Sequence, residues 1–273
     1  MAKVINGRKL AVSIRENLKR KIARSNIRPG LAAILVGNNP ASETYVGLKE
    51  KASAEVGVYF EKYLFPSKTT QISIIRKIQE LNRDKKIHGI LVQLPLPAHL
   101  NENKIIQAID SKKDADGFHS ENIKLFLKGK SIIKPGLAVG IVKLVESTKV
   151  SLKNKSIYIL AKSPIFIDPL EKMFKEKGAN VESGKKIGNM KKTDIIVVAL
   201  GRPHSILSKH IKNSAIIIDV GYNRKGDKVL GDVHPSANKK AGYFTPVPGG
   251  VGPMTVAMLL ENTYQLAKYI KSH

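Results

Sequence analysis

A tyrosine and a lysine four residues apart are the first pair of side chains that could do chemistry. Tyr45 and Lys49 fall on one face of a predicted helix at 40–56, because residues four apart lie one turn above one another. Such a pair could stack on a flat, conjugated substrate and transfer protons to it. A surface lysine beside a core tyrosine gives the same spacing, and the spacing by itself favours that structural explanation.

A glutamine at the end of a buried strand is the second candidate. Gln93 ends the apolar run 89–93 (GILVQ) and precedes a turn broken by prolines. In open α/β sheets, ligands bind outside the carboxyl ends of the strands. A polar side chain at this point is therefore about equally consistent with a ligand contact and with a cap on the backbone of the strand.

Two further segments carry polar or conformationally special residues. Asp114 and Asp116 in KDADGF could bind a metal ion or the edge of a base, but no His or Cys cluster is near, so no metal is expected. An Asp-Gly turn is the better explanation of that motif taken by itself. The segment 245–255 (TPVPGGVGPMT) holds three glycines and three prolines, which is typical of a loop that grips a ligand or rigidly connects two domains.

The elements that must position these residues alternate along the chain. Apolar, β-branched runs predict buried strands, and the segments between them predict helices, so the pattern indicates an α/β protein with parallel sheets. Strands are expected at 31–36, 89–93, 156–160, 195–200 and 215–220. Helices are expected at 8–25, 40–56, 72–82, 102–109, 141–147, 169–177 and 254–270. Pro135, Gly136 and Gly140 interrupt the pattern and indicate a domain boundary near 130–140.

Composition limits the classes of function. The net charge is +25, which favours nucleic-acid binding in principle. However, the 38 lysines outnumber nine arginines and are spread along the chain, aromatic residues make up 5%, and Trp is absent. We therefore expect a solvated lysine-rich surface and no nucleic-acid partner. The chain has no cysteine, no apolar run long enough for a membrane helix and no apolar core of a secretory signal, so a cytoplasmic protein is expected.

The motifs together resemble one family of folate enzymes. ETYVGLKEKASAEVG, GILVQLPLP, KDADGF, DVGYN, GDV and TPVPGGVGPMTVAMLLENT occur in this order across nearly the whole chain. They are similar to the methylenetetrahydrofolate dehydrogenase/methenyltetrahydrofolate cyclohydrolase (FolD) family of one-carbon metabolism. The resemblance implies a homodimer with an N-terminal folate domain at 1–137, a Rossmann-type domain at 138–254, and a final helix at 255–273 that packs back on the first domain. It also implies a folate site in the cleft between the domains.

The resemblance assigns roles to particular residues. Lys49 matches the catalytic lysine, Gln93 the glutamine that hydrogen-bonds to it, and Tyr45 the tyrosine that packs on the folate ring. Asp116 matches the aspartate that holds the pterin edge. Further substrate contacts are expected from Val92, Leu94, Pro248, Gly249, Gly250, Val251, Gly252, Pro253, Met254 and Thr255.

The dinucleotide loop departs from the family pattern. Ala161 and Ile167 stand where the family has glycines, and Asp168 adds negative charge. Contacts to the implied NADP are expected from Ala161, Lys162, Ser163 and Tyr222. The sequence thus predicts a bifunctional cyclohydrolase and NADP-dependent dehydrogenase, whose second activity the loop changes could weaken. The alternative is a cyclohydrolase that has lost NADP binding.

Overall fold

The chain forms two compact α/β units. The computed structural model describes residues 2–188, 190–226 and 228–273. One unit comprises residues 12–136 and 256–273 and is called the three-stranded unit; the other comprises residues 1–11 and 137–255 and is called the six-stranded unit. In the described part of the chain, no helix has the length and apolar character needed to cross a membrane.

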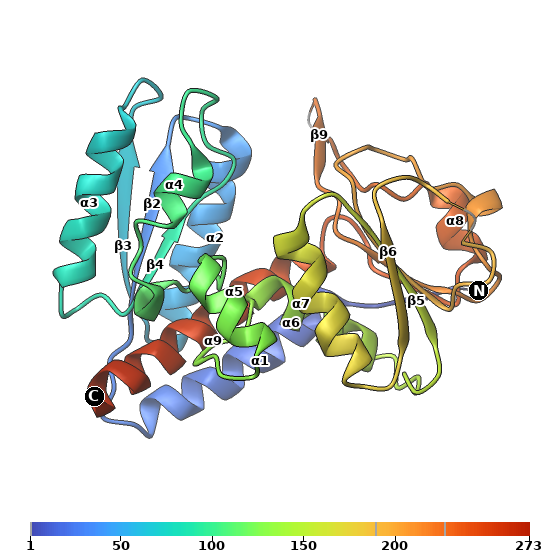
Figure 1. The fold of residues 1–273 in the computed structure, drawn as a ribbon, viewed down its shortest axis with the longest axis horizontal. Coiled ribbons are helices and arrows are strands. Elements are labelled where there is room, and N and C mark those ends of the chain that lie inside the picture. The colour runs from blue at the N-terminus through green and yellow to red at the C-terminus, as the bar shows by residue number, and fades with distance from the viewer. Residues whose placement is uncertain (1, 189, 227) are drawn as a thin grey trace. The chain divides into compact units, whose positions relative to one another are not determined.

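The three-stranded unit is built on a parallel sheet with the order β3-β2-β4 (Figure 1). Its strands are β2 (Gly30–Val36), β3 (Tyr59–Phe65) and β4 (Gly89–Val92). Every residue of β2 is buried, because alternate side chains enter two different clusters of apolar residues on the two faces of the sheet. This explains why the strand has a continuous apolar sequence.

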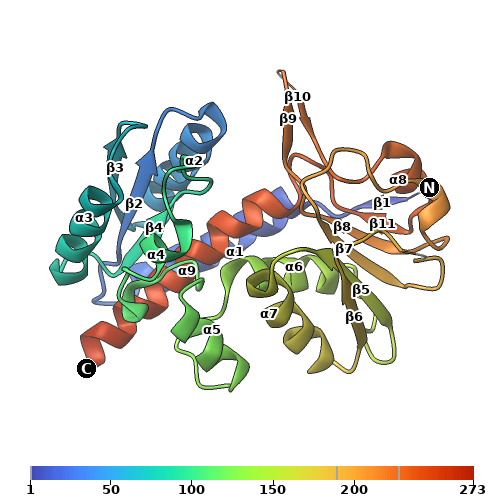
Figure 2. The same cartoon turned by 45° about the horizontal axis from the view of Figure 1, so that its top comes forward.

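Helices cover both faces of this sheet. Apolar residues of α1 (Gly7–Ala23), α2 (Pro40–Val56) and α9 (Val251–Ser272) pack on one face, and those of α3 (Gln71–Arg83) pack on the other. Figure 2 shows α9 beside α1, where Lys21 Nζ lies 3.0 Å from Glu261 Oε1. The shorter elements of this unit are α4 (Glu102–Ile106), η1 (Ser111–Lys113) and α5 (Ser120–Leu127).

The six-stranded unit has a parallel sheet with the order β1-β11-β8-β7-β5-β6. Its strands are β1 (Lys3–Val4), β5 (Ser156–Ala161), β6 (Asn180–Gly184), β7 (Ile195–Ala199), β8 (Ile216–Asp219) and β11 (Tyr243–Phe244). The remaining elements are α6 (Gly136–Glu146), α7 (Pro164–Lys175), α8 (Pro235–Lys240), η2 (Ser208–His210) and the hairpin of β9 (Asn223–Lys225) and β10 (Lys228–Leu230).

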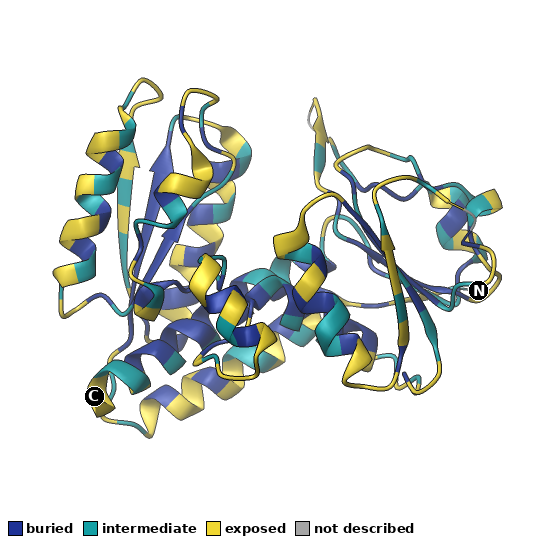
Figure 3. Ribbon diagram, viewed as in Figure 1, coloured by how far each residue is buried: buried dark blue, intermediate teal, exposed yellow. Residues whose placement is uncertain are grey.

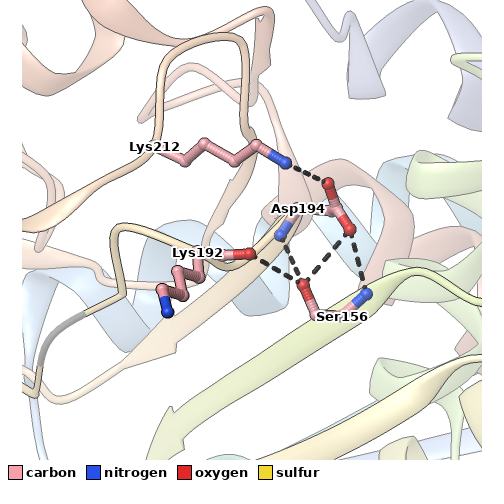
Figure 4. Close-up of polar contacts among 4 residues, drawn as sticks. All are labelled: Ser156, Lys192, Asp194 and Lys212. Atoms are coloured by element: carbon pink, nitrogen blue, oxygen red, sulfur yellow. Dashed lines mark hydrogen bonds and ion pairs between the residues drawn. The ribbon is translucent and has the colours of Figure 1, made fainter.

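A polar network joins the first residues of two central strands in the six-stranded unit (Figure 4). The carboxylate of Asp194, just before β7, accepts hydrogen bonds from the backbone N–H and the hydroxyl of Ser156 at 3.0 and 3.2 Å. Lys212 donates to the other carboxylate oxygen at 2.7 Å. These bonds lower the pKa of Asp194 against the opposing effect of burial, which is the largest single influence on it. The network is a structural brace at the amino ends of β5 and β7.

The predicted fold class is confirmed, and the differences in the elements have physical causes. The apolar runs predicted the buried strands, whereas β3 and β6, both at sheet edges, were missed because their residues are exposed or only partly buried. Figure 3 shows this contrast between the buried β2 and the partly exposed β3. The domain prediction grouped residues 1–137, but the first eleven residues belong with the six-stranded unit because β1 pairs with β11.

The helix after β5 also differs from its prediction. It was expected to start at Pro169, yet α7 begins at Pro164, with Ser163 as its N-cap, and contains Pro169 in its interior. Pro164 occupies the first helical position, where a missing N–H costs nothing. The connection between β5 and α7 is therefore only Lys162 and Ser163, and Ile167 lies inside the helix with its side chain buried.

Candidate active site

The site begins with a buried lysine on α2 that meets a glutamine at the end of β4. Lys49 Nζ donates a hydrogen bond of 2.7 Å to Gln93 Oε1. The amide of Gln93 in turn donates from Nε2 to the backbone oxygen of Leu94 at 2.7 Å. The second bond fixes which way the amide points, so its oxygen is held toward the lysine. Helix α2 is placed by its N-cap, where Asn39 accepts from the N–H groups of Ala41 and Ser42.

Burial changes the proton affinity of this lysine. Lys49 is only 7% exposed, and burial lowers its pKa, while the negative charge of Asp116 opposes the shift. Removing an ammonium group from water disfavours its charged form. The neutral amine is therefore more populated at neutral pH than in an ordinary lysine, and a neutral amine can accept a proton.

Tyr45 lies one turn before Lys49 on the same helix face. The ammonium nitrogen of Lys49 is 5.6 Å from the centre of the Tyr45 ring, and the tyrosine is partly exposed. The structure thus brings together the two residues whose spacing alone favoured a structural explanation. A partly exposed ring beside a buried amine provides a flat apolar surface next to a group that can accept a proton.

Asp116 supplies the carboxyl group of the site. Burial, opposed by the positive charge of Lys49 and reinforced by the charge of Asp114, raises the pKa of Asp116 to about 7. The residue keeps partial exposure, and its carboxylate makes no hydrogen bond with the described residues. It is therefore available to a ligand that carries N–H donors.

The neighbouring carboxylate has a different task. Asp114 is 1% exposed and accepts hydrogen bonds from Gly117 N at 3.1 Å, His119 N at 2.8 Å and Asn122 Nδ2 at 3.0 Å. These contacts hold the turn that follows it. The two aspartates of KDADGF therefore divide into one that shapes the loop and one whose carboxylate makes no hydrogen bond with the described residues.

The two apolar neighbours of Gln93 frame the end of β4. Val92 is 5% exposed in the sheet, and Leu94 is partly buried and precedes Pro95 through a cis peptide bond. All six residues from Tyr45 to Asp116 that were proposed for the substrate site lie within the three-stranded unit.

The glycine- and proline-rich segment belongs to the six-stranded unit up to Thr255. Its last residues form the first turn of α9, and Gly249 has a φ of +109°, a conformation that glycine tolerates best. A Cβ on Gly250 would lie 2.6 Å from Thr245 Cβ, and one on Gly7 would lie 1.9 Å from the oxygen of Gly250. The backbone conformation at Gly249 and close packing at Gly250 and Gly7 therefore account for these glycines, and a ligand-binding role stays a prediction.

The turn between β5 and α7 fits a dinucleotide in spite of its altered sequence. Lys162 and Ser163 are exposed, and the Ser163 side chain makes no capping bond to the helix. Ile167 is 9% exposed, so its branched side chain faces the unit's interior and leaves the helix N-terminus accessible. A lysine, a hydroxyl and a helix N-terminus together suit a phosphate group. Tyr222, in contrast, comes three residues after the end of another strand, β8, and is 38% exposed.

Two buried aspartates, Asp219 and Asp232, organise the loops near this turn. In the sequence they were noticed only as parts of the motifs DVGYN and GDV. Asp232 is fully buried and accepts from the N–H groups of Leu200, Gly201 and Arg202 at 2.6 to 3.0 Å. Asp219 accepts from the N–H groups of Gly221, Asp232 and Val233, and burial raises its pKa to about 6. Their buried carboxylates were not recognisable from a pattern of spacing.

The fold and the site define a two-unit α/β enzyme with a buried, hydrogen-bonded lysine in one unit and a Rossmann-type sheet in the other. Comparisons with known proteins give the family. Residues 5–116 match the model of the tetrahydrofolate dehydrogenase/cyclohydrolase catalytic domain, and residues 135–271 match that of its NAD(P)-binding domain. The chain belongs to the tetrahydrofolate dehydrogenase/cyclohydrolase family.

Individual relatives cover the whole length of the chain. It is 41% identical to the bifunctional protein FolD of Geotalea daltonii, over 98% of this chain and 99% of that protein. The crystal structure of FolD from Campylobacter jejuni is 40% identical with a TM-score of 0.91, covering 99% and 100% of the two chains. The FolD structure from Trypanosoma brucei, complexed with NADP and an inhibitor, is 32% identical with a TM-score of 0.92, covering 100% and 99%.

These comparisons bear on the predicted activities. The predicted family, the enzyme class and a dinucleotide cofactor are confirmed, since both family domains are present in one chain. The comparisons do not support the alternative of a cyclohydrolase without NADP binding, nor that of a weakened dehydrogenase.

Proposed function

We propose that this chain is a bifunctional folate enzyme that hydrolyses 5,10-methenyl-tetrahydrofolate to 10-formyl-tetrahydrofolate and oxidises methylene- to methenyl-tetrahydrofolate with NADP. The observation that carries the proposal is the 2.7 Å hydrogen bond from Lys49 Nζ to Gln93 Oε1, made by an amine that is almost completely buried. A buried amine with a lowered pKa and a fixed orientation is suited to general acid–base catalysis near neutral pH.

The hydrolysis needs three proton transfers, and one amine can serve all of them. Water adds to the cationic carbon of the methenyl bridge while neutral Lys49 takes one of its protons. The ammonium then gives a proton to the ring nitrogen, and the bond between that nitrogen and the bridge carbon breaks. The amine, neutral again, takes the remaining hydroxyl proton as the formyl C=O forms and passes it to water, so that one proton is released overall. Gln93 keeps the amine oriented through these steps, because its own amide is held by Leu94.

The other residues of the site bind the substrate in this proposal. Tyr45 packs on the flat ring system, and Asp116 accepts hydrogen bonds from the pterin edge with its uncommitted carboxylate. Val92 and Leu94 add contacts at the end of β4. We also propose a substrate-binding role for residues 248–255, which belong to the other unit.

The oxidation depends on the dinucleotide. NADP, when bound, supplies the hydride acceptor for the methylene group. In the six-stranded unit, Lys162 and Ser163 would hold its phosphates, Ala161 would allow close approach at the end of β5, and Tyr222 is the remaining proposed contact.

The experiment is a pair of assays on the purified protein. Loss of absorbance of methenyl-tetrahydrofolate measures hydrolysis, and reduction of NADP in the presence of methylene-tetrahydrofolate measures oxidation. We expect both activities. Absence of hydrolysis would contradict the role of Lys49, and absence of oxidation with either NADP or NAD would contradict the role of the six-stranded unit.

A homodimer in the cytoplasm is a further part of this proposal. Strand β3 lies at the edge of its sheet, with Tyr59 and Leu64 exposed at 48% and 63%. An edge strand offers backbone hydrogen-bonding groups, and a second copy of the same strand can pair with it about a twofold axis. Light scattering should give twice the chain mass. The variant Leu64→Lys should lower it toward one chain, whereas Leu127→Lys, at an exposed leucine on α5, should not.

A further inference from the structure

An asparagine on α9 ties together two chain segments that flank the carboxylate of the site. Asn262 is 8% exposed, and its Nδ2 donates hydrogen bonds of 2.9 Å to the backbone oxygens of Ala115 and of Lys134. Ala115 directly precedes Asp116. The two acceptors are 19 residues apart in the chain, so a single amide group joins them across the end of the loop.

The segment after Lys134 holds Asp116 from its other side. Gly136 N donates a hydrogen bond of 3.1 Å to the backbone oxygen of Asp116. A Cβ on Gly136 would lie 3.3 Å from Met258 Cβ and 3.6 Å from Asn262 Nδ2, so the glycine lets this segment lie close to α9. The peptide group before Asp116 is held directly by Asn262, through the oxygen of Ala115. The peptide group after Asp116 is held by Gly136, whose segment is in turn held by Asn262 through the oxygen of Lys134.

We infer that Asn262 is a positioning residue that fixes where Asp116 presents its carboxylate to the folate substrate. The inference rests on the proposed function, because it takes Asp116 to be the group that binds the pterin edge. A carboxylate that makes no hydrogen bond with the described residues depends on its backbone for its position, and the backbone at this point is held by the Asn262 amide. Nothing about the motif MLLENT in the sequence distinguished this residue from the polar residues beside it.

The alternative is that Asn262 only stabilises the fold. Two buried backbone oxygens need donors, and losing them lowers stability whatever the loop does. The two roles differ in what they change. A stabilising residue alters the melting temperature, whereas a positioning residue also alters the affinity for substrate and the titration of Asp116, which stands beside the charge of Lys49.

The experiment compares Asn262→Ala with a matched control in the same unit. Asn82 makes a similar clamp: its Nδ2 donates to Ala108 O, and its Oδ1 accepts from Asp110 N, both at 2.9 Å. Asn82→Ala therefore removes an equivalent asparagine clamp from a loop that does not carry Asp116. Asn262→Ser keeps one donor and serves as the milder variant if Asn262→Ala does not fold.

For Asn262→Ala we expect the KM for methenyl-tetrahydrofolate to rise about tenfold with a smaller change in kcat, which is the pattern of lost substrate binding. Asn262→Ser should lie between that variant and the wild type. The midpoint of the Asp116 carboxyl titration, followed by ¹³C NMR, should move by about half a unit or more in Asn262→Ala. Asn82→Ala should lower the melting temperature and leave both readouts at the wild-type values.

Two results would overturn the inference. If Asn262→Ala, or Asn262→Ser in its place, lowers the melting temperature with KM and the Asp116 midpoint unchanged, Asn262 is only structural. If the wild-type protein fails to hydrolyse the substrate, the proposed function fails on its own, and the NMR titration still decides whether Asn262 sets the environment of Asp116.

Discussion

The lysine site of the three-stranded unit and the β5–α7 turn of the six-stranded unit are built in opposite ways. Lys49 is buried, is oriented by a side chain that is itself oriented, and stands beside a carboxyl group whose pKa is raised to about 7. Lys162 and Ser163 are exposed, and neither side chain has a fixed partner in the described structure.

The difference follows from where the chemistry comes from. Proton transfer needs a protein side chain with an altered pKa, which burial, neighbouring charge and hydrogen bonding supply. A dinucleotide brings its own reactive group, so the protein has to provide only a helix N-terminus, a short turn and a positive charge. A sequence change in the turn between β5 and α7 is therefore tolerated more easily than one at Lys49.

The largest effect is expected from a substitution that disables the lysine site and leaves the β5–α7 turn intact. Lys49→Met should reduce hydrolysis by roughly 10²–10⁴-fold, because it removes the general acid–base group. NADP binding, measured by calorimetry, should stay at the wild-type value. The control Lys51→Met changes an exposed lysine on the same helix and should keep full activity. Retained hydrolysis in Lys49→Met would remove the proposed role of the amine.

The second effect concerns pH. The pKa of Asp116 is about 7, and the pKa of Lys49 is lowered, so both ionised Asp116 and neutral Lys49 become more populated as pH rises. We expect kcat/KM for hydrolysis to rise between about pH 6 and 8. Asp116→Asn should lower kcat/KM about tenfold or more and remove the part of the pH dependence that belongs to the carboxyl group. An unchanged profile in this variant would show that Asp116 does not titrate in the catalytic range.

A third test changes the β5–α7 turn and leaves the lysine site intact. Lys162→Ala should raise the KM for NADP about tenfold, which is the scale of one lost charged contact to a phosphate, and leave hydrolysis unchanged. Lys153→Ala, an exposed lysine in the same unit, is the control. The comparison between the two regions would be wrong if Lys162→Ala impaired hydrolysis as strongly as oxidation.

The smallest effect is on stability. The folded state raises the pKa of Asp116 from 3.8 to about 7, so its contribution to the free energy of unfolding is present below pH 4 and is lost as pH rises through 7. Allowing for the partial exposure of the side chain, this loss is about 1–2 kcal/mol. Urea unfolding at pH 5 and pH 8 should show a difference in the wild type that is smaller in Asp116→Asn. Equal pH dependence in both proteins would place the carboxyl group in a water-like environment.

The local sequence was sufficient to predict the strands that are buried throughout and the helix that has clear capping residues. The buried strands, such as β2 and β4, and helix α2 were predicted to within a residue or two. Burial leaves a continuous apolar run in the strands, and Asn39, Pro40 and Gly57 mark the ends of the helix. The edge strand β3 and the start of α7 were missed, since exposure and a second proline obscure their patterns. The N-terminal strand could not be assigned to its sheet, because its two residues pair with β11 some 240 residues away.

The candidate site shows the same division. From the residues alone, Tyr45, Lys49 and Asp116 favoured a structural explanation, and for Gln93 the structural and functional explanations were about equal. The resemblance to a family assigned roles to all four. Only the tertiary structure decided that Lys49 is buried against Gln93, that Asp114 is used up in its own turn while Asp116 remains available, and that Asn262 holds the loop. The physical reason is that residue types and their order are local properties, whereas desolvation and hydrogen bonding depend on partners 44 or 147 positions away in the chain.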